Sequence, residues 1–130
     1  MNIVVGYVAT DQGRAAVERA IEEARRRGAR LVVVHSLGKG SGEEAPEYQD
    51  RLEALRVRLE EVDVDGEIHE YARGQSPAED ILQAAREFEA GLVVIGLRDR
   101  TRTGKFFLGS NAQDVLLGAP CDVLAVKPSS

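Results

Sequence analysis

The sequence predicts an α/β protein built on an open, mostly parallel five-stranded sheet with helices on both faces. Short apolar runs rich in valine and isoleucine alternate along the chain with longer segments of helical periodicity. The runs are apolar almost without interruption, as expected of strands that are buried on both faces of a parallel sheet. A length of 130 residues is enough for one core and not for two. We therefore expect a single domain.

Composition limits the classes of function. Hydrophobic residues make up 43% and charged residues 30% of the chain, which is typical of a globular domain in water. A net charge of −5 argues against nucleic acids and anionic membranes as partners. The lone Cys121 allows no internal disulfide, and no apolar run approaches the length of a membrane span. We expect a cytoplasmic protein.

The first half of the chain predicts two strands and two helices. The first helix has an apolar stripe and a terminal run of arginines, followed by a glycine suited to the C′ position. Glycine and serine between 38 and 44 predict a flexible loop. The expected elements are a strand at 3–8, a helix capped by Thr10 or Asp11 and ended by Gly28, a strand at 31–37 and a helix at 47–62.

The second half predicts three strands and two helices. Charged residues interrupt the strand at 64–71, which favours an edge position. Ser76 and Glu79 form a capping box with proline at the first helical position. The remaining elements are a strand at 92–95, a short helix ended by Gly118, a strand at 122–127 and a tail at 128–130. The full order is β-α-β-α-β-α-β-α-β, a Rossmann-like arrangement with right-handed crossovers in one domain at 1–127.

The stretch at 91–114 carries the strongest functional signal. A buried strand ends at Gly96, a basic segment follows, and a helix begins near Gly109. We expect Ser110 or Asn111 to cap this helix, whose first amides and dipole attract anions. One interpretation is a phosphate cradle at the carboxyl ends of the strands. The other is a solvated basic loop that only connects two elements.

Other chemistries lack their signatures. Ser110 has no base in a motif with it, so a nucleophilic hydrolase is not supported. His35, His69 and Cys121 are isolated from one another in sequence and do not form a metal-binding pattern. The P-loop and the glycine-rich dinucleotide fingerprint are also absent. The sequence therefore predicts no catalytic residues and no metal ligands.

The whole chain resembles the universal stress protein family, most clearly at 95–96, at 109–110 and in its ending at 119–127. Nucleotide-binding members carry glycine, two residues, glycine, nine residues, then glycine and serine or threonine. Gly96, Gly109 and Ser110 match this pattern, whereas Asp99 stands at the middle glycine. Val8 stands where binding members have an acidic residue that contacts the ribose or adenine end of the nucleotide.

The resemblance implies a site for an adenine nucleotide, with ATP expected and Mg²⁺ as a companion ion. Three roles remain open for Asp99: it binds Mg²⁺ that screens its charge, it pairs with a neighbouring arginine, or it marks a member that no longer binds ATP tightly. The expected nucleotide-binding residues are Val8, Ala9, Thr10, Val34, Gly96, Arg98, Gly109, Ser110 and Asn111.

Two classes of function follow. In the first, the protein is a non-enzymatic regulator whose nucleotide-dependent change is sensed by a protein partner; slow ATP hydrolysis is compatible with this class, although no general base is evident. In the second, it is a nucleotide-independent dimeric stress or interaction module whose site has decayed at Val8 and Asp99. The family resemblance implies a homodimer through the last strand, Asp122 to Lys127, in both classes.

Overall fold

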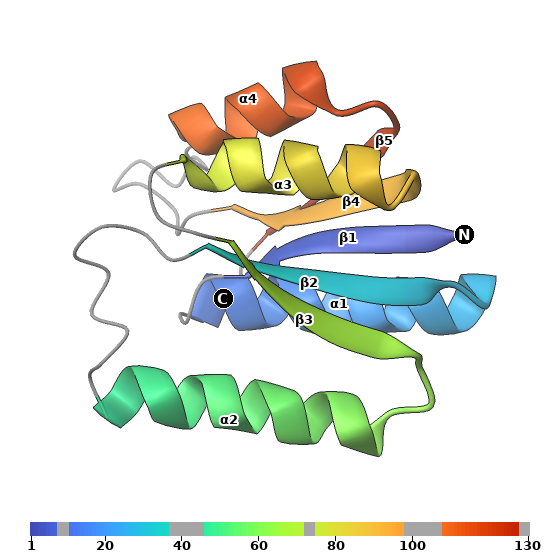
Figure 1. Ribbon diagram of the computed structural model, residues 1–130, viewed down its shortest axis with the longest axis vertical. Helices are drawn as coiled ribbons and strands as arrows, with labels where there is room; N and C mark the ends of the chain where they lie inside the picture. Colours follow the sequence, from blue (N-terminus) through green and yellow to red (C-terminus); the bar gives the residue numbers. More distant parts are fainter. Residues whose placement is uncertain (8–10, 37–45, 72–74, 98–107, 128–130) are drawn as a thin grey trace.

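The computed structural model describes residues 1–7, 11–36, 46–71, 75–97 and 108–127. Strands and helices alternate along the described chain, and the sheet lies between two layers of helices (Figure 1). The strands are β1 (Asn2–Tyr7), β2 (Arg30–Ser36), β3 (Gly66–Tyr71), β4 (Ala90–Gly96) and β5 (Asp122–Val126). The helices are α1 (Asp11–Arg27), α2 (Pro46–Glu61), α3 (Pro77–Glu87) and α4 (Ser110–Gly118).

The sheet is parallel throughout, with the strand order β3-β2-β1-β4-β5. The predicted fold class is therefore confirmed. The chain builds outward from β1 to β3, then returns to the other side of β1 to add β4 and β5. The direction of winding reverses between β1 and β4, and in such folds a crevice opens at the carboxyl ends of the strands at that point.

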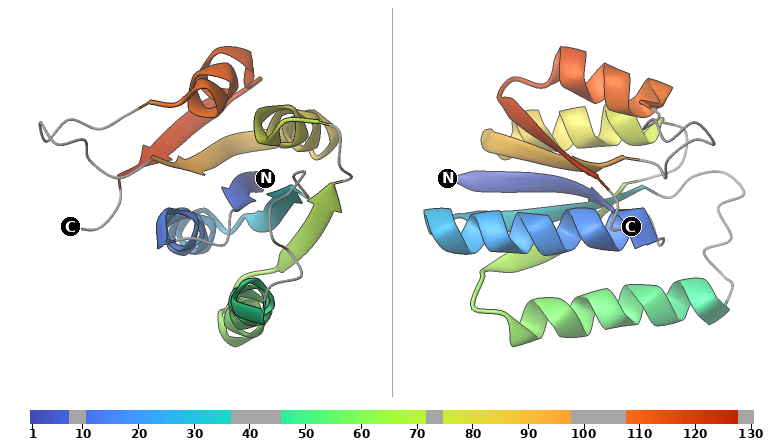
Figure 2. Two further views of the ribbon diagram at one scale, coloured as in Figure 1. Left: turned by 90° about the vertical axis from the view of Figure 1, so that its left-hand side faces the viewer. Right: turned by 180° about the vertical axis from the view of Figure 1, so that it is seen from behind.

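Helices α1 and α2 cover one face of the sheet, and α3 and α4 cover the other (Figure 2). Side chains along a strand alternate between the two faces, so a strand with a core on both sides is apolar at every position. In β2, Leu31 and Val33 pack with α1, whereas Val32 and Val34 pack with α3. The two cores account for the continuous apolar runs in the sequence.

The C-terminal end of α1 and the start of α3 follow the predicted chemistry. The Ser76 hydroxyl accepts a hydrogen bond from the Glu79 amide at 3.1 Å, with proline at the next position. Three arginines end α1, and Gly28 follows with a φ of 63°, a left-handed conformation that favours glycine. These caps are set by local sequence.

The predicted cap of α4 by Ser110 or Asn111 is wrong. The N-cap is Gly109, which has no side chain to accept a hydrogen bond, and both predicted caps lie inside the first turn. The Asn111 side chain serves a different helix, because its Oδ1 accepts a hydrogen bond from the Ala78 amide of α3 at 3.2 Å. Asn111 thus joins the beginnings of α3 and α4.

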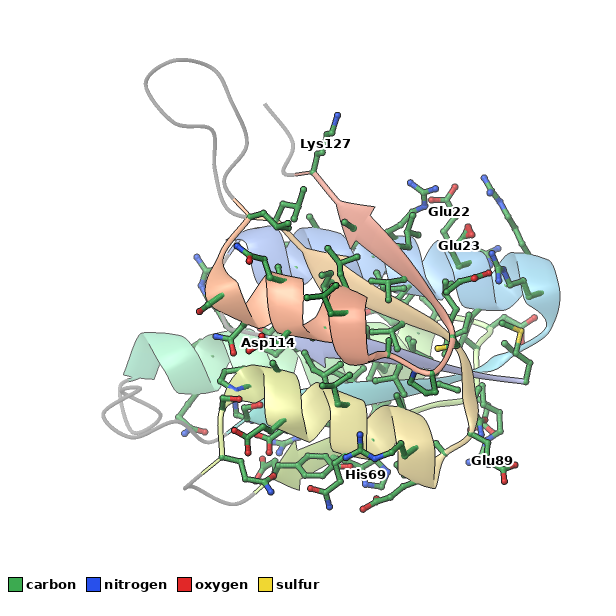
Figure 3. All side chains as sticks on the ribbon, turned by 90° about the horizontal axis from the view of Figure 1, so that it is seen from above. Glu22, Glu23, His69, Glu89, Asp114 and Lys127 are labelled. Atoms are coloured by element: carbon green, nitrogen blue, oxygen red, sulfur yellow. The ribbon has the colours of Figure 1, made fainter. Side chains whose placement is uncertain are left out.

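Strands β3 and β5 form the two edges of the sheet. The predicted edge position of the third strand is confirmed, and β3 carries Glu67, His69 and Glu70. In Figure 3, His69 lies close to α3; its ring centroid is 4.9 Å from that of Phe88, and its Nε2 is 2.8 Å from Glu67. In the described residues, no helix has the length and apolar character needed to cross a membrane.

Candidate functional site

A cavity of about 190 Å³ opens at the carboxyl ends of β1, β2 and β4. The beginnings of α3 and α4 form its opposite wall. The strands and the residues at their ends contribute Gly6, Tyr7, Val34, Ser36, Ile95, Gly96 and Leu97, and the helices with their caps contribute Gly13, Pro77, Ile81, Gly109, Asn111, Ala112 and Val115. The cavity therefore occupies the position at which winding reverses.

Four of the predicted site residues line this cavity: Val34, Gly96, Gly109 and Asn111. Ser110 does not line it; this residue is exposed at the start of α4, beside Gly109. The other predicted ligands lie outside the described residues, as do the loop at 38–44, the tail at 128–130 and Asp99. These predicted ligands are Val8, Ala9, Thr10 and Arg98.

One end of the cavity is suited to an anion. Pro77 begins α3 and Gly109 precedes α4, so two helix N-termini meet at this end. Ser76 and Asn111 already accept hydrogen bonds from amides in the first turn of α3. Gly109, the N-cap of α4, has no side chain to cap the helix, so it does not compete with a ligand for the amides of the first turn.

Much of the remaining cavity wall is apolar, although Tyr7 and Ser36 also line it. Val34, Ile81, Ile95 and Val115 are each at least nine-tenths buried and come from two strands and two helices. A Cβ atom on Gly6 would lie 2.5 Å from Cδ1 of Ile81, so the glycine allows α3 to pack closely on β1. A cavity with a mainly apolar wall and two helix N-termini suits an aromatic ring that carries an anionic group.

Sequence reasoning missed a polar pair beside the apolar wall. Ser36 ends β2 and lines the cavity, and Asp80 lies in the first turn of α3 with only 1% of its surface exposed. Burial raises the pKa of Asp80, the nearby Ser36 hydroxyl lowers it in part, and the charge of Glu79 raises it further. Among the described residues, neither Asp80 oxygen has a hydrogen-bond partner. The signal in the sequence is an acidic residue, Asp80, within the apolar stripe of the helix α3.

Neither histidine lines the cavity. His35 is buried on the α1 face, with its ring centroid 6.2 Å from that of Tyr7 and its Nδ1 4.0 Å from Glu70. Burial raises the pKa of Tyr7, while Arg51 and Arg14 lower it in part. Among the residues that the structure describes, no group of three histidine, cysteine or acidic side chains is arranged to hold a metal ion.

Comparison with known proteins agrees with this fold. The model of the universal stress protein family matches residues 1–127. The chain belongs to the universal stress protein family. The universal stress protein of Mycolicibacterium smegmatis is 41% identical over 127 residues, which cover 97% of each chain.

Two solved structures of family members are similar over nearly the whole chain. A universal stress protein from Archaeoglobus fulgidus has a TM-score of 0.80 and 38% identity, with 98% of each chain covered. A structure of the universal stress protein from the same organism in complex with dAMP has a TM-score of 0.73 and 34% identity, again with 98% of each chain covered. At least one similar member of this family thus binds an adenine nucleotide.

Proposed function

We propose that this protein is a stress-response regulator that binds an adenine nucleotide, with ATP as its ligand, at the carboxyl edge of the sheet. The observation that carries the proposal is the cavity itself, which combines an apolar slot with the uncapped beginning of α4. The dAMP complex of the A. fulgidus relative supports the choice of adenine over other ring systems. ATP rather than a monophosphate is chosen because the basic segment after β4 supplies further positive charge.

The orientation of the nucleotide follows from the two ends of the cavity. We expect the base to lie between Val34 and Ile81 and the phosphates to lie over Gly109, toward Ser110. Arg98 would then contact the phosphates, and Mg²⁺ would screen Asp99 if that carboxylate faces them.

The first test is thermal unfolding of nucleotide-stripped protein with ATP, ADP, AMP and cyclic AMP, each with and without Mg²⁺. A ligand at a hundred times its Kd stabilises the folded state by about 2.7 kcal/mol, a shift of several degrees for a domain of this size. The proposal expects the largest shift with ATP. A shift confined to AMP would place the affinity in adenine and ribose, and no shift at millimolar concentrations would contradict the proposal.

Gly109→Asp tests the phosphate end without damaging the helix. The backbone at Gly109 (φ −68°, ψ 169°) is the extended conformation of an N-cap, which aspartate favours, so α4 should remain folded. The new carboxylate would repel phosphates and should weaken ATP binding at least tenfold. Gly109→Asn is the matched control, since it has the same size and capping ability without the charge. Equal ATP affinities for the two variants would contradict the phosphate assignment.

We propose a binding role without chemical turnover. In the described part of the chain, Ser110 has no hydrogen bond to a histidine or a carboxylate that could activate it. A regulator of this kind would act through a protein partner that distinguishes the nucleotide-bound form from the free form. Release of inorganic phosphate from ATP at a rate that depends on Ser110 would contradict this part of the proposal.

A nucleotide-independent dimeric module is the second candidate, and the β5 edge favours dimerisation in either case. Residues 123–126 are apolar and only half-buried. An apolar strand at the open edge of a sheet promotes association with another chain. We propose that two copies pair through Asp122 to Lys127. Ala125→Lys should shift sedimentation from dimer to monomer, whereas Val57→Lys, an exposed apolar position on α2, should not. A wild-type monomer at micromolar concentration would contradict the homodimer.

A further inference from the structure

A second hollow lies between α1 and α2, on the face of the sheet opposite α3 and α4 (Figure 2). Its volume is about 700 Å³, which is within the range of small-molecule sites in proteins. The buried residues Tyr7, Val17 and Leu55 form its floor. Two exposed arginines, Arg14 on α1 and Arg51 on α2, also line it. This groove therefore offers a ligand both apolar surface and positive charge.

The helical repeat sorts the groove residues of α2 into two rows. Arg51 and Leu55 share the row that faces the floor, because residues four apart lie on the same side of a helix. The acids lie in the outer row, farther from α1, where Asp50, Glu53 and Glu61 line the groove and are exposed. A ligand on the floor thus lies next to the arginine row, while the acidic outer row disfavours a ligand with several negative charges.

An ion pair joins the two helices across the groove. The Arg58 Nε of α2 lies 3.2 and 3.0 Å from the two carboxylate oxygens of Glu18 on α1, and its Nη2 lies 2.9 Å from Oε1. This bidentate contact holds the helices at a defined separation. The two charges compensate each other, so the positive charge available to a ligand lies nearer the start of the two helices, beside Tyr7.

The Tyr7 hydroxyl is a polar group of the floor without a partner in the described part of the chain. Tyr7 is 5% exposed, and no hydrogen bond contributes to its pKa, which burial raises and the charges of Arg51 and Arg14 lower in part. Arg14 itself has no ion pair among the described residues. Buried hydroxyls are almost always hydrogen-bonded. A donor and a cation thus meet at one end of the groove, where they suit an anionic group.

We propose that the groove between α1 and α2 binds a small monocarboxylate with an apolar body. The carboxylate accepts hydrogen bonds from the Tyr7 hydroxyl and the Arg14 guanidinium. The apolar body lies on Val17 and Leu55 and covers Val57, a residue of the groove that is 43% exposed. This site is separate from the proposed nucleotide site, and each of the two proposals can fail without the other.

The binding test compares octanoate with octanol by calorimetry. The wild-type protein should bind octanoate about tenfold more tightly, and Arg14→Gln should remove this preference by weakening octanoate alone. Tyr7→Phe keeps the ring in the core and removes only the hydroxyl, so it should weaken octanoate several-fold. Arg86→Gln is the control, since it removes the same charge from an exposed position on α3, on the opposite face of the sheet. This variant should bind octanoate as the wild-type protein does.

Methyl NMR locates the ligand. Octanoate should shift the signals of Val17 and Leu55, and each methylene added between butanoate and octanoate should tighten binding by up to about fourfold. Shifts confined to Ile81 and Val115 would place octanoate in the cavity at the strand ends and would overturn the inference. Equal affinities for octanoate and octanol, an unchanged octanoate affinity in Arg14→Gln, or no binding at millimolar concentrations would overturn it as well.

Discussion

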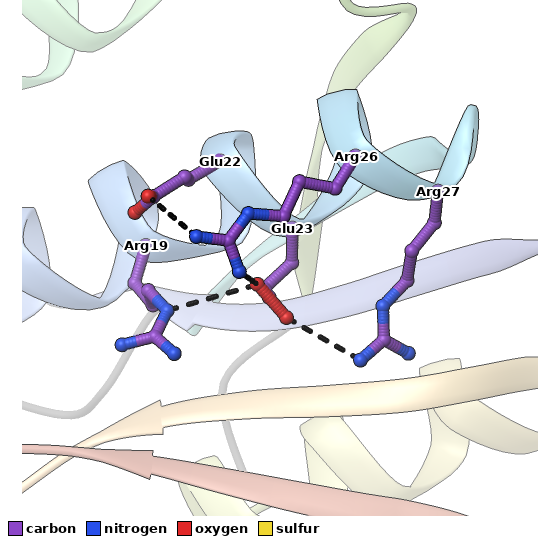
Figure 4. A network of polar contacts seen from close by, with 5 residues as sticks. All are labelled: Arg19, Glu22, Glu23, Arg26 and Arg27. Atoms are coloured by element: carbon purple, nitrogen blue, oxygen red, sulfur yellow. Dashed lines mark hydrogen bonds and ion pairs between the residues drawn. The ribbon is translucent and has the colours of Figure 1, made fainter.

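Two carboxylates among the described residues, Glu23 and Asp80, are buried, and their surroundings differ. Glu23 is 6% exposed and lies within ion-pair distance of Arg19 at 3.8 Å, Arg26 at 3.3 Å and Arg27 at 3.3 Å (Figure 4). Asp80 is 1% exposed and has the Ser36 hydroxyl nearby but no counter-ion among the described residues.

The difference separates a structural charge from a functional candidate. Glu23 lies near the end of α1, away from the cavity, and its charge is balanced by arginines of its own helix. Asp80 precedes Ile81, which lines the cavity, and no side chain among the described residues balances its buried charge. The burial of a charged side chain therefore points to a function only when its ion-pair and hydrogen-bond partners are also considered.

The largest effect is expected from Glu23→Ala. Removal of this carboxylate leaves three arginines without their shared partner and should lower the free energy of unfolding by about 2 kcal/mol. The arginines are partly exposed and can turn to water, which keeps the loss below that of a fully buried pair. Urea unfolding measures it.

Glu22→Ala is the matched control on the same helix, because Glu22 is exposed and contacts only Arg26 among the described residues. This substitution should lower the free energy of unfolding by no more than about 0.5 kcal/mol. Equal losses for the two variants would show that burial of Glu23 does not strengthen its ion pairs.

Asp80→Asn should have a smaller effect of opposite sign. At neutral pH the neutral amide removes an unbalanced buried charge, so the free energy of unfolding should increase by about 1 kcal/mol. Urea unfolding of the two proteins measures this gain. A clear loss of stability instead would mean that Asp80 has a favourable partner in the folded state.

The gain in the free energy of unfolding from Asp80→Asn should increase as the pH rises from acid toward neutral. The pKa of Asp80 is raised in the folded state above its ordinary value of 3.8. The folded state therefore holds this proton more tightly, and the stability that it provides is complete below pH 3.8 and lost as pH rises through the folded pKa. The difference between wild type and Asp80→Asn should vanish in acid and grow toward neutral pH. A difference that stays constant across this range would contradict the raised pKa.

The smallest effect concerns Asn111, a polar residue of the cavity wall that does have a hydrogen-bond partner. Asn111→Ala removes the acceptor of the Ala78 amide and should lower the free energy of unfolding by about 0.5 kcal/mol, since Asn111 is itself exposed and water can replace it. Asn111→Asp keeps an acceptor and should show no such loss in thermal unfolding. A loss of equal size in both variants would assign the effect to something other than this hydrogen bond.

The parts of the fold predicted from sequence are those set by local patterns. The apolar runs specified the strands, the charges of 64–71 specified an edge, and Ser76 with Glu79 specified the start of α3. The start of α4 was misassigned because Gly109, Ser110 and Asn111 are all acceptable caps by residue type. The role of Asn111 depends on a backbone amide that is 33 residues away in sequence.

The sequence by itself determined the family fold and the placement of Val34, Gly96, Gly109 and Asn111 at one edge of the sheet, because parallel strands bring their carboxyl ends together. Only the tertiary structure placed Ser36 in the cavity wall and buried Asp80. A serine at a strand end and an acid in the first turn of a helix are both ordinary in a sequence, where nothing records how much water reaches them. Packing of α3 on β2 removes that water, and an unsatisfied buried charge then becomes visible.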